Sequence, residues 1–181
     1  MLEVKFDISG VDNLCNRLVG ELKKTKGAKA GYIKDKKYEN GFSLIQNALT
    51  QEYGATIPVT PKMRAWFRHQ GIHLKKKAIV IPPRPFLRNA LKDQKLWCRY
   101  VQENFDAEGN GTLTLRQLAL RVALLMRNSI INSIGAMTTP ANSGFTLSRK
   151  KPKTHPLVNT NTLADSVQVG VIKGEVQNGG A

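Results

Sequence analysis

The sequence has few cysteines, few acidic residues and no long apolar run, and these shortages exclude several classes of protein. The two cysteines, Cys15 and Cys98, form no CxxC pair and share no zinc-ligand spacing with the three histidines, so we expect ordinary buried or half-buried thiols. No stretch approaches the roughly 20 apolar residues that span a bilayer. The first ten residues lack the basic-then-apolar pattern of a signal peptide. We therefore expect a protein of the cytoplasm, or one assembled there.

Motifs of catalysis are also missing. The sequence contains no GxSxG, P-loop, GxGxxG or HExxH pattern, and its three histidines lie far apart without an accompanying carboxylate motif. Catalysis needs acids, bases or nucleophiles held in position, and few acidic residues lie in segments expected to form special loops. We therefore expect no enzyme activity and no cofactor or metal, although distant segments can still assemble a triad in space.

One stretch, at 106–117, resembles the loop of a calcium-binding EF-hand. Asp106, Glu108 and Asn110 occupy loop positions one, three and five, but position twelve, where the loop needs a bidentate carboxylate, is Gln117. No second such loop exists in the chain. The alternative is a turn between two helices, in which Thr114 caps the second helix and Gln117 reaches back to it. We favour this capping box over calcium binding.

Positive charge is what the sequence has in abundance. It contains 28 Lys and Arg against 13 Asp and Glu, which gives a net charge of +15 and a pI near 10.1. The basic residues gather at 23–37, 73–77 and 148–153. Such a balance favours a polyanionic neighbour, either nucleic acid or an acidic protein surface, although basic clusters also occur in flexible, solvated loops.

Hydrophobic periodicity predicts a mixture of helices and short strands without a regular strand–helix–strand rhythm. Within it, Trp66 and Phe67 are either packing anchors or an exposed contact, and we favour core packing. We expect Leu118 and Arg127 to lie on the apolar and polar faces of one helix. The expected elements are a strand at 2–8, a helix after it, a helix at 43–53 ended by Gly54, a strand at 78–81, a helix from Pro85 to about Phe105, a turn at 107–111, a helix at 115–134, and a helical turn followed by a strand after 163.

This pattern predicts an α+β fold in one domain over residues 1–181. We expect a small, mostly antiparallel sheet packed against two or three helices, two of which form a helical hairpin. Long basic loops are expected over about 23–40, 55–77 and 135–156.

Three short motifs follow one another along the chain. ALTQEYGATIPVTPKMRAWF contains a Glu–aromatic–Gly triplet at a helix end, IVIPPRPFLRNAL contains an Ile-Pro-x-Arg-Pro-Phe sequence, and THPLVNTNTLADSVQVGV resembles a Pro-Leu-x-x-Thr-Gly-x-Leu-x-x-Ser motif. In order and rough spacing, over about residues 40 to 172, they resemble the phage virion-morphogenesis and tail-completion proteins. The matching residues are Glu52, Tyr53, Gly54, Pro82, Pro83, Arg84, Pro85, Phe86, Pro156, Leu157, Thr160, Leu163 and Ser166.

The chemistry of the central motif is structural. Its three prolines restrict the backbone and keep it out of a sheet interior. Arg84 is suited to fork onto carboxylates or backbone carbonyls, or alternatively to contact a DNA phosphate, and Phe86 to anchor a helix start. In the late motif Asn161 stands where the family usually has Gly, and Asn159 where it has Asp. Because Asn tolerates positive φ better than most residues, we expect the turn at Asn161 to be kept.

The resemblance implies a structural virion protein without catalysis, acting in tail completion or head–tail joining at the phage neck. Its implied partners are identical subunits in a ring, expected to be a hexamer, neighbouring connector and tail proteins, and DNA passing through the ring, with no membrane contact. Basic side chains facing such a lumen would lower the energy of the passing phosphates. The alternatives are a tail terminator and a free-standing basic DNA-binding protein.

Overall fold

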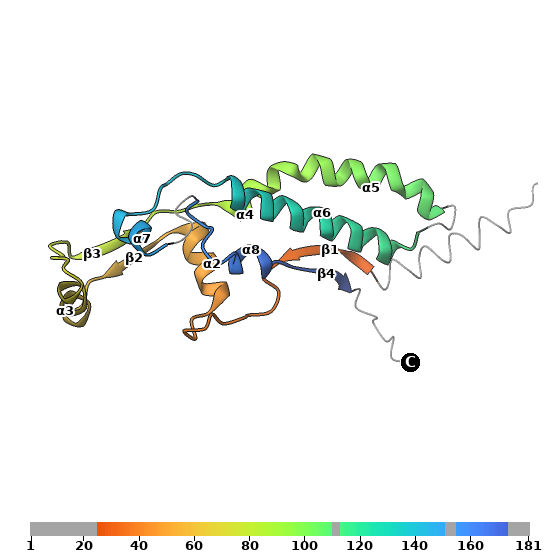
Figure 1. The fold of residues 1–181 in the computed structure, drawn as a ribbon. Coiled ribbons are helices and arrows are strands. Elements are labelled where there is room, and N and C mark those ends of the chain that lie inside the picture. Colours follow the sequence, from red (N-terminus) through yellow and green to blue (C-terminus); the bar gives the residue numbers. More distant parts are fainter. Residues whose placement is uncertain (1–24, 110–112, 151–154, 174–181) are drawn as a thin grey trace, which may run out of the picture. The chain divides into compact units, whose positions relative to one another are not determined.

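The computed structural model describes residues 25–109, 113–150 and 155–173 (Figure 1). The strand expected at 2–8, the helix after it and Cys15 lie outside these residues. The chain divides into two compact units. Unit 1 comprises Met1–Ile33, Leu91–Ser129 and Val167–Ala181, and unit 2 comprises Lys34–Ala90 and Ile130–Ser166. The single domain expected over 1–181 stays a prediction.

Unit 1 contains an antiparallel sheet of two strands, β1 (Thr25–Gly31) and β4 (Gln168–Lys173). The register pairs Ala28 with Val171. β4 confirms the strand expected late in the sequence, whereas β1 shows that the loop expected over 23–40 was wrong for these residues. Lysine, glycine and alanine give β1 a weak strand propensity, which the pairing with a distant strand outweighs.

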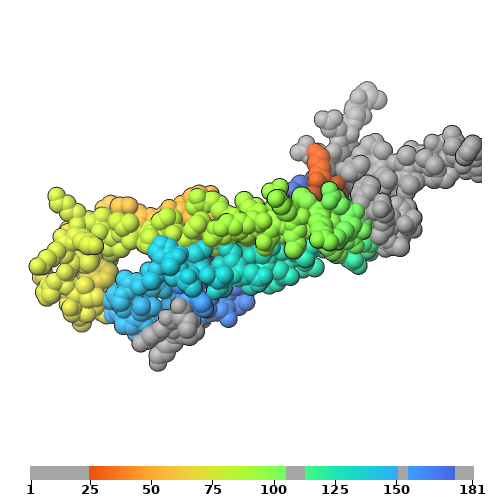
Figure 2. Space-filling model, turned by 90° about the horizontal axis from the view of Figure 1, so that it is seen from above, coloured from red at the N-terminus to blue at the C-terminus, as the bar shows by residue number. Residues whose placement is uncertain are grey.

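A pair of adjacent helices confirms the expected helical hairpin. α5 (Gln94–Gly109) and α6 (Leu115–Ala136) run side by side in both views (Figures 1 and 2). Where they meet, the buried Trp97 indole N–H donates to Ser129 Oγ at 3.2 Å. A turn was expected over 107–111, but α5 continues through Gly109, so the helix ends later than expected. Ala and Glu at 107 and 108 favour helix, and a glycine is tolerated at a helix end.

α6 begins with the predicted capping box. Thr114 Oγ1 accepts from the Gln117 backbone N–H at 3.2 Å, and Gln117 Oε1 accepts from the Thr114 backbone N–H at 2.7 Å. Leu118 is buried, as expected. Arg127, expected on the solvated face, is half-buried and donates from Nε to the Val167 carbonyl at 3.1 Å, because its long side chain reaches an acceptor beside the core.

The helix expected from Pro85 to about Phe105 is divided into three. α4 (Phe86–Ala90) belongs to unit 2, and the 3₁₀ turn η1 (Leu91–Asp93) then leads to α5 in unit 1. A 3₁₀ turn winds more tightly than an α-helix and so changes the phase of the apolar stripe. As a result Ala90 is buried in unit 2 and Trp97 in unit 1.

Unit 2 opens with α2 (Leu44–Tyr53), which confirms the helix expected at 43–53. Ser43 Oγ accepts from the Gln46 backbone N–H at 3.1 Å and caps the start. Gly54 ends the helix at φ 77°, a conformation that favours glycine.

Residues 55–81, here called the basic arm, form a strand–helix–strand unit. β2 (Ala55–Pro58) pairs antiparallel with β3 (Ala78–Ile81), and α3 (Pro61–His69) lies between them in sequence. β3 was expected, but the loop expected over 55–77 was wrong for β2 and α3. Thr60 accepts from the Met63 N–H at 3.2 Å, and a proline in the first helical turn costs no hydrogen bond, so α3 begins well.

Two short helices complete unit 2. α7 (Gly144–Arg149), capped by Ser143, corrects the loop expected over 135–156. α8 (Thr162–Asp165) confirms the helical turn expected before the last strand. The buried apolar side chains of unit 2 are Leu44, Ala48, Phe86, Ala90, Ile130, Ile134, Met137, Leu157 and Leu163.

The architecture confirms the expected α+β class, with two small antiparallel sheets and several helices. Two further expectations about single residues were wrong. Cys98 is exposed, because it follows the buried Trp97 on α5 and so points to another side of the helix. Trp66 is 51% exposed. Across the described ranges no helix is both long and apolar enough to cross a bilayer.

Candidate functional site

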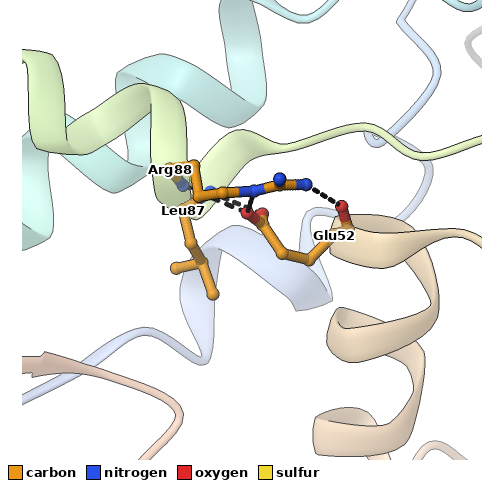
Figure 3. A network of polar contacts seen from close by, with 3 residues as sticks. All are labelled: Glu52, Leu87 and Arg88. Atoms are coloured by element: carbon orange, nitrogen blue, oxygen red, sulfur yellow. Dashed lines mark hydrogen bonds and ion pairs between the residues drawn. The ribbon is translucent and has the colours of Figure 1, made fainter.

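The first motif contributes a buried carboxylate that caps α4. Glu52, at the end of α2, is 1% exposed. Its Oε2 accepts from the Leu87 backbone N–H at 2.8 Å, and its Oε1 accepts from the Arg88 N–H at 3.1 Å (Figure 3). These amides open α4 and have no partner within the helix. A carboxylate there also lies at the positive end of the helix dipole.

Arg88 completes this network because its guanidinium binds both the carboxylate and the backbone carbonyl of Glu52 (Figure 3). Its Nε lies 2.9 Å from Glu52 Oε1, and its Nη2 donates to the Glu52 backbone carbonyl at 2.9 Å. The guanidinium also lies 5.3 Å from the ring centroid of Tyr53, whose own side chain is exposed. The buried charge of Glu52 is therefore neutralised and fully hydrogen-bonded.

Gly54 is required where it stands. Its φ of 77° is unfavourable for other residues. A Cβ added to it would lie 2.7 Å from the Ile81 carbonyl oxygen and 3.0 Å from the Pro83 nitrogen. The glycine thus allows the end of α2 to approach the chain that leaves β3, so the first two motifs touch through backbone.

The second motif places Arg84 at the centre of a set of oxygens. Its Nη1 donates to Gln51 Oε1 at 2.8 Å, its Nε to the Pro140 carbonyl at 2.9 Å, and its Nη2 to the Ala141 carbonyl at 3.3 Å and Asn142 Oδ1 at 3.2 Å. Its backbone N–H donates to the Gln51 carbonyl at 2.6 Å.

The surroundings of Arg84 confirm its predicted fork onto backbone carbonyls. Burial lowers the pKa of its guanidinium from the ordinary value. With 4% exposure and four oxygen partners, Arg84 is not placed to contact a DNA phosphate, so the geometry opposes that alternative. The prolines act as expected: β3 ends at Ile81, directly before Pro82, and α4 begins after Pro85, with Phe86 fully buried.

The third motif joins this network through Pro156, the first residue of its Pro-Leu pattern. The Pro156 carbonyl accepts from Asn142 Nδ2 at 3.3 Å and from Lys150 Nζ at 2.9 Å. Lys150 is 5% exposed and also donates to the His155 carbonyl. Burial, and then the nearby charge of Arg84, lower the pKa of the Lys150 ammonium.

The rest of the late motif is structural. Leu157, Leu163 and Ser166 are buried. Thr160 lies in the turn before α8, where its hydroxyl is 2.7 Å from that of Thr162. Asn161 has φ 57°, which confirms the positive φ expected where the family usually has glycine. No side-chain hydrogen bond of Asn161 caps α8.

We call residues 51–54, 82–88 and 140–142, with Pro156, the junction. Sequence reasoning missed three of its side chains, those of Gln51, Arg88 and Asn142, and also Lys150, which donates to the Pro156 carbonyl from outside it. A buried arginine demands acceptors and a buried glutamate a cation, so the motifs signalled that such partners exist. Nothing in the spacing identified Asn142, which lies 58 positions from Arg84.

A cleft of about 830 Å³ borders the junction within unit 2. Gln51, Asn142, Lys150, Pro156 and Thr160 are among the residues that line it. Metal-ligating side chains do not gather there: across the described ranges, no three His, Cys, Asp or Glu residues lie close enough together to hold an ion.

Comparisons of the chain with protein-family models, with curated proteins and with solved structures found no match. The resemblance to the phage tail-completion proteins therefore rests on the three motifs alone and stays a prediction.

Proposed function

We propose that the chain is a structural virion protein of a tailed phage or prophage. It acts without catalysis in tail completion or head–tail joining, as one subunit of a homo-oligomeric ring around the DNA passage. It is assembled in the bacterial cytoplasm and ends in the neck or tail of the virion, beside connector and tail proteins.

One observation carries this proposal: the three motifs that suggest the family converge on the junction. Glu52 and Gly54 of the first motif hold the segment that contains Arg84, and Arg84 in turn reaches Asn142, which binds the Pro156 carbonyl of the third motif. Residues far apart in sequence thus depend on one another. Such mutual dependence is expected of a shared structural signature.

The chemistry of the junction supports an architectural role. Arg84 and Glu52 are buried, and each is engaged by several hydrogen-bond partners, so neither has a proton or a charge to offer a substrate. Such saturated polar contacts fix the backbone of unit 2 in one arrangement. A ring subunit needs this property, because its contact surfaces must repeat from copy to copy.

A deletion in the phage that encodes the chain tests the proposal. Virions made with and without the chain are compared by electron microscopy, and expression of the chain from a plasmid provides the control. We expect full heads and finished tails that remain unjoined when the chain is absent. Normal virions would disprove the proposal, and tails of irregular length would favour the alternative of a tail terminator.

The oligomeric state tests the ring separately. Native mass spectrometry of the purified chain, with the tail or connector partner added where needed, should reveal a species six times the subunit mass of 20.1 kDa. A protein that stays monomeric with every partner and binds DNA in that form would favour the free-standing DNA-binding alternative, to which the charge of the basic arm lends support.

A further inference from the structure

The basic arm is the most one-sidedly charged segment of the described chain. Residues 55–81 contain six Lys and Arg and no Asp or Glu. The arm lies at one end of unit 2 in both views (Figures 1 and 2). A surface with charge of one sign attracts polyanions and speeds their encounter.

One of the six cations, Arg64, fixes the loop that contains three of the others. Arg64 is half-buried, and its guanidinium donates to the Leu74 carbonyl and, at 3.0 Å, to the Lys76 carbonyl. It therefore holds the loop that contains Lys75, Lys76 and Lys77 against α3. A cluster whose backbone is already fixed loses less conformational freedom when it binds.

The remaining five cations are available to a partner. Lys62, Arg68 and the three lysines at 75–77 are all exposed. The ion pairs found in the described ranges are Arg88 with Glu52 and Arg99 with Glu103, so none of these five cations has a carboxylate partner there.

Trp66 adds an aromatic contact to this surface. It lies on α3 one turn after Lys62 and is 51% exposed. The Phe67 and Phe145 rings support it at centroid distances of 4.9 and 6.2 Å, both edge to face. These contacts fix the indole while half of its surface stays in solvent.

Two other kinds of partner, a membrane surface and a second copy of the chain, fit the arm less well. A membrane-surface helix needs a broad apolar face, but Met63 and Phe67 are half-buried and leave Trp66 as the exposed large apolar side chain of α3. A second copy carries the same net charge of +15, so the arm and the copy repel each other.

We propose that the basic arm binds duplex DNA through its phosphates. The five exposed cations contact the backbone, and Trp66 packs against a sugar or base edge. Duplex DNA carries one charge per roughly 1.7 Å, which favours a compact cluster of cations. A single-stranded partner would call for several exposed aromatic platforms in succession, whereas the arm exposes one. The inference takes the source of the DNA from the proposed function, but the affinity of the arm is measured independently.

Salt-dependent binding of the full chain to a short duplex of mixed sequence tests the inference by fluorescence anisotropy. Replacing Lys75, Lys76 and Lys77 by Gln should weaken binding about tenfold or more and lower the slope of log affinity against log salt by about 2–3. The control replaces Lys92, Lys95 and Arg116 by Gln, which removes the same charge at exposed positions outside the arm. It should weaken binding less than about threefold. Circular dichroism checks that both variants are folded.

A second readout follows Trp66 itself. DNA should quench its fluorescence, and Trp66→Phe should abolish the quenching while the buried Trp97 remains. Equal weakening by the arm and control variants would overturn the inference, as would tighter binding to anionic lipid vesicles or to single strands than to the duplex. If the deletion leaves heads and tails unjoined but the arm variant binds DNA like the control, the proposed function stands and this inference fails. If virions are normal but the arm binds DNA as expected, the proposed function fails and this inference stands.

Discussion

Basic side chains serve different ends in two parts of unit 2. In the junction Arg84 is buried and donates to four oxygens, and Arg88 grips a buried carboxylate. In the basic arm Lys75–Lys77 are exposed, and no described carboxylate pairs with them. The same charge therefore stabilises the fold in one place and stays available in the other. Net charge alone does not distinguish these two roles, whereas burial and partners do.

Substitution of two arginines should give the largest difference in stability between the junction and the basic arm. Arg84→Met should lower the free energy of unfolding by about 3–5 kcal/mol, because its buried acceptors lose their donor. Arg68→Met, in the exposed part of the arm, should change it by less than about 0.5 kcal/mol. Urea unfolding followed by circular dichroism measures both. Equal losses would show that the burial of Arg84 does not matter to stability.

Two glycines provide the next comparison. Gly54 and Gly71 have similar φ angles, 77° and 75°, but a Cβ at Gly54 meets the Ile81 carbonyl, whereas at Gly71 it meets nothing within 4 Å. Gly54→Ala should cost about 2–4 kcal/mol and Gly71→Ala about 1 kcal/mol. Thermal melting of the two variants gives the difference. A smaller loss at Gly54 would mean that the junction backbone yields easily.

Glu52 tests whether the cap or the ion pair matters more. Glu52→Gln keeps one acceptor and should lower the free energy of unfolding by about 1–3 kcal/mol. Arg88→Met should cost less, because the Arg88 side chain is half exposed to screening solvent and two backbone N–H groups still donate to the Glu52 carboxylate. A double-mutant cycle in urea separates the two contributions. A larger loss from Arg88→Met would reverse this ranking.

The smallest effect concerns pH. Burial and then Arg84 lower the pKa of Lys150 in the folded chain, so the unfolded chain holds that proton more tightly. The stability of the wild type relative to Lys150→Met should therefore rise with pH between the lowered pKa and the ordinary value of about 10.4, and be level outside this window. Melting temperatures of both proteins across alkaline pH measure it. A relative stability that falls over this window would contradict the direction.

Features set by adjacent residues were predictable from sequence. The capping box of Thr114 and Gln117, the stop at Gly54 and the positive φ of Asn161 each depend on a few neighbouring positions. α3 was missed although Thr60 and Pro61 announce its start, because it spans only nine residues within a basic, proline-containing stretch. The helix is held from outside, by contacts such as that between Phe67 and Phe145.

Features set by distant residues were not predictable. β1 exists because β4 pairs with it, and its own lysines and glycines give little sign of a strand. Arg84 was identified as a structural residue, but its acceptors at 140–142 lie in a segment that has no signature of its own. The motifs thus located the junction, while its partners came only from the fold.

The position of Gly54 governs how the basic arm is oriented. The arm leaves the junction at Ala55 and returns to it at Ile81, and these two residues pair with each other directly beside Gly54. Both ends of the arm are thus held at one place. A rotation of the arm relative to the junction would have to break the pairing of Ala55 with Ile81. In any rotationally symmetric assembly, each copy would then extend its lysines at the same angle to the axis. A side chain at position 54 would collide with the Ile81 carbonyl, and would therefore disturb that angle as well as the stability.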